Sequence, residues 1–174
     1  MDLGLTNARV LVTAASAGLG AATARKFSQE RAVVVISSRN LEKLQQTAAA
    51  IVEETGNPVF TFRADVSQPE EIERLVRNSA EVLGGLDVLV TNAGGPPSGR
   101  FDDFSLEQWQ EATQLTLFSA MNLVRAALPH LRQSVRAAIL TVTSISAREP
   151  IDNLILSNTL RPAVIGLTKS LANE

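Results

Sequence analysis

The sequence has no cysteine and a single histidine, His130, and these two shortages exclude whole classes of chemistry. Without cysteine there is no disulfide, no thiolate nucleophile and no cysteine-based metal site, which fits a reducing compartment. One histidine directly after Pro129 supports neither a Ser/His/Asp triad nor a multi-histidine metal centre. We therefore expect no bound metal, and we expect His130 to lie partly exposed at a helix end.

An excess of one charge and a long apolar run are also missing. Lys and Arg together number 16 and Asp and Glu 18, which gives a net charge of -2 without any basic or acidic run. Nucleic acid and anionic membranes are therefore not favoured as partners. No apolar run has the length of a membrane span, and the N-terminus carries an acid where a signal peptide has positive charge. We expect a cytoplasmic protein that binds a small molecule or another protein.

What is present is an alternation of short apolar runs with longer helical patterns, over a length that suits one domain, 1–174. Runs rich in Val, Ile and Leu are typical of buried strands. Their alternation with helices predicts an α/β fold with a doubly wound parallel sheet. The predicted strands cover residues 8–14, 32–37, 58–64, 86–92 and 137–143.

Two predicted helices begin with capping-box patterns. Residues 67–70 give one such pattern, and residues 105–108 give the other, for a helix that runs to Leu131. The apolar residues of the second helix cover more than one face, which is more than packing on a sheet requires. This excess predicts a second buried contact on residues 106–131, most simply with a partner subunit.

A glycine-rich turn, TAASAGLG (13–20), follows the first predicted strand and opens a helix. Such a turn lets the backbone approach a phosphate, and the helix N-terminus offers free N–H groups and the positive end of a dipole. Gly18 and Gly20 fit this role, although a glycine pair is also common in a simple packing turn. A second Gly/Pro loop, 94–104, follows the fourth strand at the same, ligand-binding side of the sheet.

The end of the second strand carries Ser38 and Arg39, about twenty residues beyond the glycine turn, where a dinucleotide-binding domain contacts the adenosine ribose. An acid at this point would bond the 2'-hydroxyl and repel a 2'-phosphate. A hydroxyl followed by a guanidinium suits a 2'-phosphate, so the sequence favours NADP(H) over NAD(H). The alternative is that Arg39 only keeps a loop solvated.

Taken together, these segments resemble the short-chain dehydrogenase/reductase family. Five segments carry the resemblance in order and cover nearly the whole chain: TAASAGLG, Asp65–Val66, LDVLVTNAG (86–94), ILTVTS (139–144) and PAVIGLTKSLANE (162–174). The resemblance implies a Rossmann-type NAD(P)-binding domain that acts with small carbonyl or alcohol substrates. It also implies a homodimer or homotetramer built through residues 106–131, with which the apolar excess of that helix agrees. It implies cofactor contacts from Thr13, Ser16, Gly18, Leu19, Gly20, Ser38, Arg39, Asp65, Val66, Asn92, Ala93, Gly94 and Arg161.

Catalysis in the family rests on a Ser, a Tyr, a Lys four residues after the Tyr, and an Asn on the long preceding helix. The resemblance places Ser144 at the family serine, Ser157 in the Tyr position, Arg161 in the Lys position and Thr116 in the Asn position. Because the chain contains no tyrosine, no other phenol can replace the missing acid. A serine hydroxyl is a far poorer proton donor, and loss of a positioned acid costs about 100- to 10,000-fold in rate.

Three further departures from the family pattern matter. The family loop begins Thr-Gly where this chain has Ala14, which costs nothing unless the backbone requires a positive φ. Pro162 directly follows Arg161, so the last helix is expected to begin late, with Ser157 or Asn158 as its N-cap, or to bend there. The family continues with further strands, so the sheet is expected to lack the C-terminal strands and the domain to be C-terminally incomplete.

Two functions from different classes follow. The first is an NADP(H)-dependent oxidoreductase that transfers hydride to or from a carbonyl or secondary alcohol with an atypical site. The alternative is a non-catalytic NADP(H)-binding sensor or assembly module, which the replaced catalytic positions favour. A purely structural subunit leaves the Ser38–Arg39 pair and the glycine turn unexplained. Sequence alone gives neither the substrate nor the proton donor.

Overall fold

The computed structural model of the chain describes residues 3–174, and its centre is a single parallel sheet of five strands. The strand order is β3-β2-β1-β4-β5, so the chain crosses from one half of the sheet to the other after β3. This is the Rossmann-type doubly wound arrangement that the sequence predicts, and all five predicted strands are confirmed. The strands are β1 (Arg9–Val12), β2 (Val33–Ser38), β3 (Val59–Arg63), β4 (Val88–Thr91) and β5 (Ala138–Thr141).

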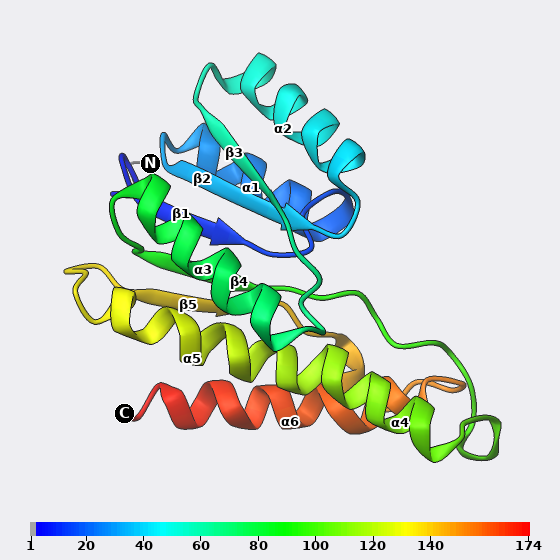
Figure 1. Cartoon of the computed structure of the whole chain (residues 1–174). Coiled ribbons are helices and arrows are strands. Elements are labelled where there is room, and N and C mark those ends of the chain that lie inside the picture. Colours follow the sequence, from blue (N-terminus) through cyan, green and yellow to red (C-terminus); the bar gives the residue numbers. More distant parts are fainter. Residues whose placement is uncertain (1–2) are drawn as a thin grey trace.

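Helices cover both faces of the sheet (Figure 1). Helices α1 and α2 lie on one face, whereas α3, α5 and α6 lie on the other, with α6 running beside the long α4–α5 helix. Among residues 3–174, no helix is both long and apolar enough to cross a membrane. The helices are α1 (Gly18–Gln29), α2 (Leu41–Thr55), α3 (Pro69–Leu83), α4 (Leu106–Thr113), α5 (Ser119–Leu131) and α6 (Ile155–Leu171).

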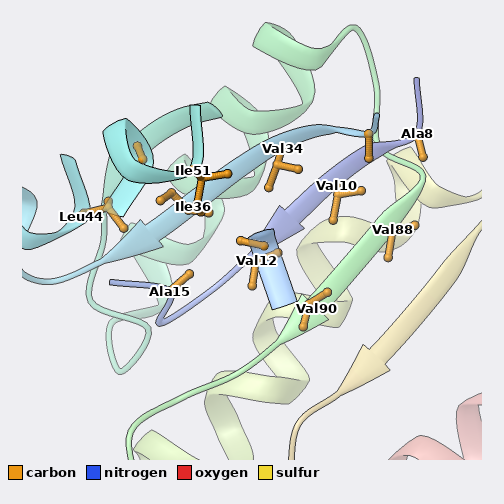
Figure 2. Close-up of a cluster of buried hydrophobic side chains, with 13 residues drawn as sticks. Ala8, Val10, Val12, Ala15, Val34, Ile36, Leu44, Ile51, Val88 and Val90 are labelled. Carbon is orange, nitrogen blue, oxygen red and sulfur yellow. The ribbon is translucent and has the colours of Figure 1, made fainter. Parts of the chain in front are cut away.

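Two apolar cores result from the strict alternation of side chains along each strand. Val10 and Val12 of β1 point to the α1/α2 face, whereas Leu11 between them points to the α3/α5 face. Figure 2 shows the first core, in which valines of β1, β2 and β4 pack with Leu44 and Ile51 of α2. Burial on both faces explains why β1, β2 and β4 read as continuous apolar runs, whereas β5 leaves alternate side chains exposed.

The long helix and its capping box are confirmed, with one local change of geometry. Ser105 caps α4, because its Oγ accepts from Gln108 N while the Gln108 side chain accepts from Ser105 N. Between α4 and α5 the helix widens into a single π-helical turn, η2 (Gln114–Phe118). Such turns are rare in proteins, and many of those that occur lie at functional sites. The sequence pattern gave no sign of it, because the apolar residues of this helix cover more than one face and so hide the shift in phase that one extra residue causes.

Two predicted helix starts are wrong. The N-cap of α3 is Gln68, with Pro69 in the first turn as predicted, but the Ser67 hydroxyl bonds Asp65 instead of capping the helix. The last helix begins at Ile155, so Ser157 lies inside it, and Pro162 is accommodated within the helix. Packing of α6 along the neighbouring helices therefore outweighs the local preference of proline for a helix start.

Candidate functional site

The glycine turn after β1 has the geometry of a phosphate cradle. Gly18 has a φ of 56°, in the left-handed region, and opens α1. A Cβ on Gly20 would lie 2.5 Å from Ala14 O and 2.9 Å from Asn92 Nδ2, so only glycine fits this close approach. The N-cap residue Ala17 makes no side-chain bond to the first turn of α1. The first N–H groups of this helix are therefore left for a ligand such as an anion.

Thr13 fastens the turn to the end of the neighbouring strand β4. Its buried hydroxyl donates to Asn92 O at 2.6 Å and accepts from Asn92 N at 2.9 Å. The Asn92 side chain in turn donates to Ala14 O at 3.2 Å. The predicted contacts Thr13 and Asn92 thus hold the shape of the cradle, because their polar groups are already bonded to one another.

The turn also contains a strained backbone conformation, which the sequence alone did not decide. Ala14 has a φ of 48°, a left-handed conformation that costs a non-glycine residue about 1–2 kcal/mol. The backbone at Ala14 therefore has the positive φ at which alanine is less favourable than glycine. Residues that hold such strain cluster at ligand-binding and catalytic sites, where the surrounding bonds impose the conformation.

A cavity of about 270 Å³ extends from this turn across the carboxyl ends of β2 and β3. Ser38 and Arg39 line one side of it, as predicted, together with Lys43 from the first turn of α2. Arg39 and Lys43 are both exposed cations, so one end of the cavity is positively charged. The full lining is Ala14, Ser16, Ser38, Arg39, Asn40, Lys43, Ala64, Asp65, Val66, Gly94 and Leu115.

The Asp65–Val66 pair forms the opposite wall of the same cavity. The Asp65 carboxylate is held in place, because its Oδ1 accepts from Ser67 N at 2.9 Å and from Ser67 Oγ at 2.8 Å. Glu71 fixes the backbone from behind by accepting from Asp65 N at 2.8 Å. This wall is therefore rigid before any ligand binds, which lowers the entropy that binding costs.

Ser144 and Ser157 are connected through a residue that the sequence analysis did not select, Ser146. Ser144 caps a short 3-10 turn, η3 (Ile145–Ala147), and its Oγ accepts from Ser146 N at 3.1 Å. The Ser146 Oγ lies 2.9 Å from the Ser157 Oγ, and both side chains are buried. The hydroxyl in the Tyr position is thus paired inside the protein.

Arg161 lies one helical turn after Ser157 and is buried, with 8% of its surface exposed. Its Nη1 donates to Val142 O at 3.3 Å, at the end of β5 and two residues before Ser144. Burial lowers the pKa of the Arg161 guanidinium from its ordinary value, but a guanidinium still keeps its charge in a protein. No carboxylate forms an ion pair with Arg161 in the part of the chain that the structure describes.

Thr116, the residue in the family Asn position, lies in the π-helical turn η2. It lines a small cavity together with Asn92, Ala93 and Arg161. Three of the four predicted catalytic residues, Thr116, Ser157 and Arg161, are therefore buried behind the carboxyl ends of β4 and β5, and Ser144 is half-buried beside them. The predicted cofactor contact Leu19 does not line the large cavity, and 69% of its surface is exposed.

Sequence reasoning missed Lys43 and Ser146 for different reasons. Lys43 follows Arg39 by four residues at the start of a helix, so its spacing could have identified it. The pairing of Ser146 with Ser157 has no such signal, because it joins a loop to a helix through tertiary contact alone.

The residues present fit the adenosine and diphosphate parts of a dinucleotide. The close approach at Gly20, the open N-terminus of α1 and the cationic end beside Ser38 suit phosphates at two separate points. Among residues 3–174, no group of three or more His, Asp or Glu side chains is arranged to hold a metal ion.

Comparison with known proteins gives consistent matches over nearly the whole chain. The sequence model described as short chain dehydrogenase matches residues 8–174. The pig (Sus scrofa) dehydrogenase/reductase SDR family member 4 is 35% identical over 171 residues. That match covers 98% of this chain but 61% of the pig protein, so the chain spans less than two thirds of this relative's length.

Two solved structures are similar over the same region. L-sorbose reductase from Gluconobacter frateurii, complexed with NADPH and L-sorbose, superposes with a TM-score of 0.95 at 30% identity, covering 99% of this chain and 66% of the reductase. An NADPH-bound short chain oxidoreductase from Pseudomonas aeruginosa PAO1, described as containing an atypical catalytic center, gives a TM-score of 0.90 at 31% identity. That match covers 94% of this chain and 65% of the oxidoreductase.

Proposed function

The chain belongs to the short chain dehydrogenase family, and from this membership we propose that it is the cofactor-binding and catalytic part of an NADP(H)-dependent oxidoreductase with an altered proton-transfer site. The proposed reaction transfers a hydride to or from a carbonyl or secondary alcohol. The observation that carries the proposal is the buried Arg161, which keeps a fixed cation bonded to Val142 O, two residues before Ser144, although the usual Tyr and Lys have been replaced.

Preference for NADP(H) rests on the cationic end of the large cavity. Arg39 and Lys43 supply two positive charges there, and Ser38 lines the same cavity. Two cations beside a hydroxyl favour a 2'-phosphate over a free ribose hydroxyl. Two similar structures were solved with NADPH bound, which supports the same choice. In this proposal Asp65 and Val66 hold the adenine, and Asn92, Ala93 and Gly94 support the cofactor behind β4.

The chain's own residues would share the catalytic work as follows. A nicotinamide dinucleotide bound in the large cavity would supply or accept the hydride. Ser144 donates a hydrogen bond to the substrate oxygen, and the Arg161 cation stabilises negative charge that develops on that oxygen. The Ser157 hydroxyl, held by Ser146 at 2.9 Å, orders this corner but is too weak an acid to replace a phenol. Water is then the proton source, and the rate is low.

The first test is a fluorescence titration of the 174-residue chain with NADPH and, in parallel, NADH. We expect saturable binding that is tighter for NADPH, and a loss of about tenfold or more in Arg39→Asp, because the substitution places an acid beside the 2'-phosphate. Arg77→Asp, an exposed change of the same charge on α3, is the matched control and leaves binding unchanged. Equal affinity for both dinucleotides contradicts the proposed preference.

The second test separates the enzyme from a binding module. The pairing of Ser157 with Ser146 favours a non-catalytic NADP(H) sensor as the second candidate, because the hydroxyl in the Tyr position is already bonded. We expect the protein to oxidise NADPH with a carbonyl substrate, and Ser144→Ala to reduce the rate by about tenfold or more. NADPH binding without turnover, unchanged by Ser157→Tyr combined with Arg161→Lys, favours the sensor.

We also propose that the protein is a homodimer or homotetramer through the α4–α5 helix. Leu106, Phe118 and Met121 on this helix expose 70%, 42% and 41% of their surfaces. Large apolar side chains on one helix are typical of a subunit contact. Sedimentation of Phe118→Glu with Met121→Glu is expected to give a smaller particle than the unmodified protein. The same size for both rules out this helix as the contact.

A further inference from the structure

One side chain outside the large cavity joins helix α2 to the glycine turn. Thr47, which is half-buried on α2, donates a hydrogen bond from its Oγ1 to Ser16 O at 2.9 Å. Ser16 lies two residues before Gly18 and lines the cavity, whereas Thr47 does not line it. The bond therefore holds the backbone of the turn from behind, and the Thr47 side chain stays out of the ligand's space.

The direction of this bond is uncommon for a threonine inside a helix. Such a hydroxyl usually bonds the carbonyl four residues earlier in its own helix. Thr55, on the same helix, does so with Ile51 O at 2.8 Å. Thr47 instead bonds a residue that is 31 positions away in the chain. Its hydroxyl thus connects two elements and does not serve its own helix.

The same helix also carries the cationic end of the cavity. Asn40 caps α2 by accepting from Lys43 N at 2.9 Å, and Ser38 Oγ donates to Asn40 O at 3.0 Å. Lys43 and Thr47 are four residues apart, so they lie on one face of α2. The first two turns of α2 therefore connect the cationic end to the glycine turn.

Packing keeps α2 in one position on the sheet. Its Leu44 and Ile51 are fully buried in the first core, against valines of β1, β2 and β4 (Figure 2). A helix packed in this way shifts only if that close-packed core opens. Because α2 is fixed and Thr47 bonds the turn, the spacing between the turn and the cationic end is set before a ligand binds.

We propose that Thr47 is a positioning residue that sets the spacing between the two phosphate-binding points of the cavity, the glycine turn and the cationic end. The inference rests on the proposed NADP(H) binding and adds a residue that acts without touching the cofactor. By holding Ser16 in place, the bond lowers the entropy that is lost when a nucleotide with phosphates at both points binds. A nucleotide with a phosphate at the cationic end alone gains nothing from it.

Two simple nucleotides separate these cases. Adenosine 2',5'-bisphosphate reaches both points, whereas adenosine 2'-monophosphate reaches only the cationic end. Thr47→Val removes the hydroxyl with little change in shape. By calorimetry we expect it to weaken binding of NADPH and of the bisphosphate about three- to tenfold, and to leave binding of the monophosphate within about twofold. Thr47→Ser keeps the hydroxyl and should restore the affinity. An unchanged affinity for the bisphosphate, or an equal loss for both nucleotides, overturns the proposal.

Thr55→Val is the matched control, because it removes another half-buried threonine hydroxyl from the opposite end of α2. The Thr55 Oγ1 bonds Ile51 O and lies 2.8 Å from Ser28 Oγ, so this change also costs stability. We expect it to leave all three affinities within about twofold. A loss equal to that of Thr47→Val would show that affinity follows helix stability, and it overturns the proposal. Should Thr47→Val fail to fold, Thr47→Ala is compared with Thr47→Ser.

Amide hydrogen exchange tests the same bond without any ligand. Ala15 N, one residue before Ser16, donates to Ser37 O at 2.9 Å. We expect this amide to exchange about five- to tenfold faster in Thr47→Val than in the unmodified chain or in Thr55→Val. Unchanged exchange overturns the proposal. If the unmodified chain binds no nucleotide, the proposed function fails, and this exchange rate alone decides whether Thr47 positions the turn.

Discussion

The two ends of strand β4 carry polar clusters of opposite character. At its start, the buried Asp87 accepts hydrogen bonds from Arg9 N, Nε and Nη2 and from Ser134 Oγ, at 2.6–3.0 Å. At its end, Thr91, Thr116 and Arg161 face one another across a cavity with no protein partner for Thr91 Oγ1, Thr116 Oγ1 or Arg161 Nε among residues 3–174. The polar atoms at the start of the strand are bonded to one another, whereas those three at its end have no bond within the described residues.

This difference separates a structural cluster from a functional one. In a buried ion pair in which every polar atom is bonded, removal of one partner strongly destabilises the fold, and no group is left for a ligand. Polar atoms that the protein itself leaves unpaired reduce stability and are concentrated at sites where a ligand or water completes them. Both clusters contain an arginine, so residue type alone does not tell them apart.

The largest expected effect comes from breaking the cluster at the start of β4. Asp87→Ala removes the acceptor of four hydrogen bonds and leaves Arg9 without its counter-charge. We expect the free energy of unfolding to fall by about 2–3 kcal/mol, below the full cost for a buried pair because Arg9 is 30% exposed. Urea unfolding measures this change, and Asp102→Ala, an exposed carboxylate, is the control. A loss equal to that of the control contradicts the structural role.

Acid should weaken the same cluster without a mutation. The hydrogen bonds from Arg9 hold the pKa of Asp87 well below its ordinary value. A depressed folded-state pKa gives stability that is fully present above the unfolded pKa of about 4 and is lost as the pH falls below it. We expect about 1–2 kcal/mol of the unfolding free energy to disappear between about pH 4 and pH 2. Asp87→Asn should flatten this part of the stability profile, as urea titrations at several pH values would show.

The cluster at the end of β4, which contains Arg161, should show the opposite response to mutation: a small change in stability and a large loss of activity. Arg161→Met removes the cation that has no carboxylate partner and keeps an apolar chain of similar length. We expect the free energy of unfolding to change by less than about 1 kcal/mol, whereas NADPH oxidation falls to background. Arg9→Met, the matched change in the cluster at the start of β4, should cost about 2–3 kcal/mol. Equal losses of stability in both variants would remove the distinction between the two ends of the strand.

The smallest expected effect concerns the turn bonded to the end of β4. Ala14 has a φ of 48° and accepts from the Asn92 side chain through its carbonyl. Ala14→Gly relieves the left-handed strain and is expected to raise the unfolding free energy by about 0.5–1 kcal/mol, after the greater entropy of the unfolded glycine is subtracted. Ala22→Gly, at an exposed position inside α1, should lower it instead by about 1 kcal/mol. A stabilisation by both would indicate an unrelated cause.

Part of the site could be predicted because its signals are local. The apolar runs predicted all five strands, and parallel strands place their carboxyl ends at one edge of the sheet. Ser38, Arg39 and Asp65 therefore line one cavity, as the sequence suggested. The capping box at Ser105 was correct because both of its bonds lie within four residues. The similar pattern at Ser67 failed, because Asp65 competes for the same hydroxyl.

The sequence by itself determined the alternation of strands and helices, the glycine turn, the missing tyrosine and the cation in the Lys position. Only the tertiary structure decided the left-handed Ala14, the pairing of Ser146 with Ser157, and the meeting of Thr91, Thr116 and Arg161 at one cavity. The physical reason is the separation along the chain over which each kind of interaction acts. Periodicity and turn propensity act over a few neighbouring residues, whereas partners and burial depend on packing between segments far apart in the chain.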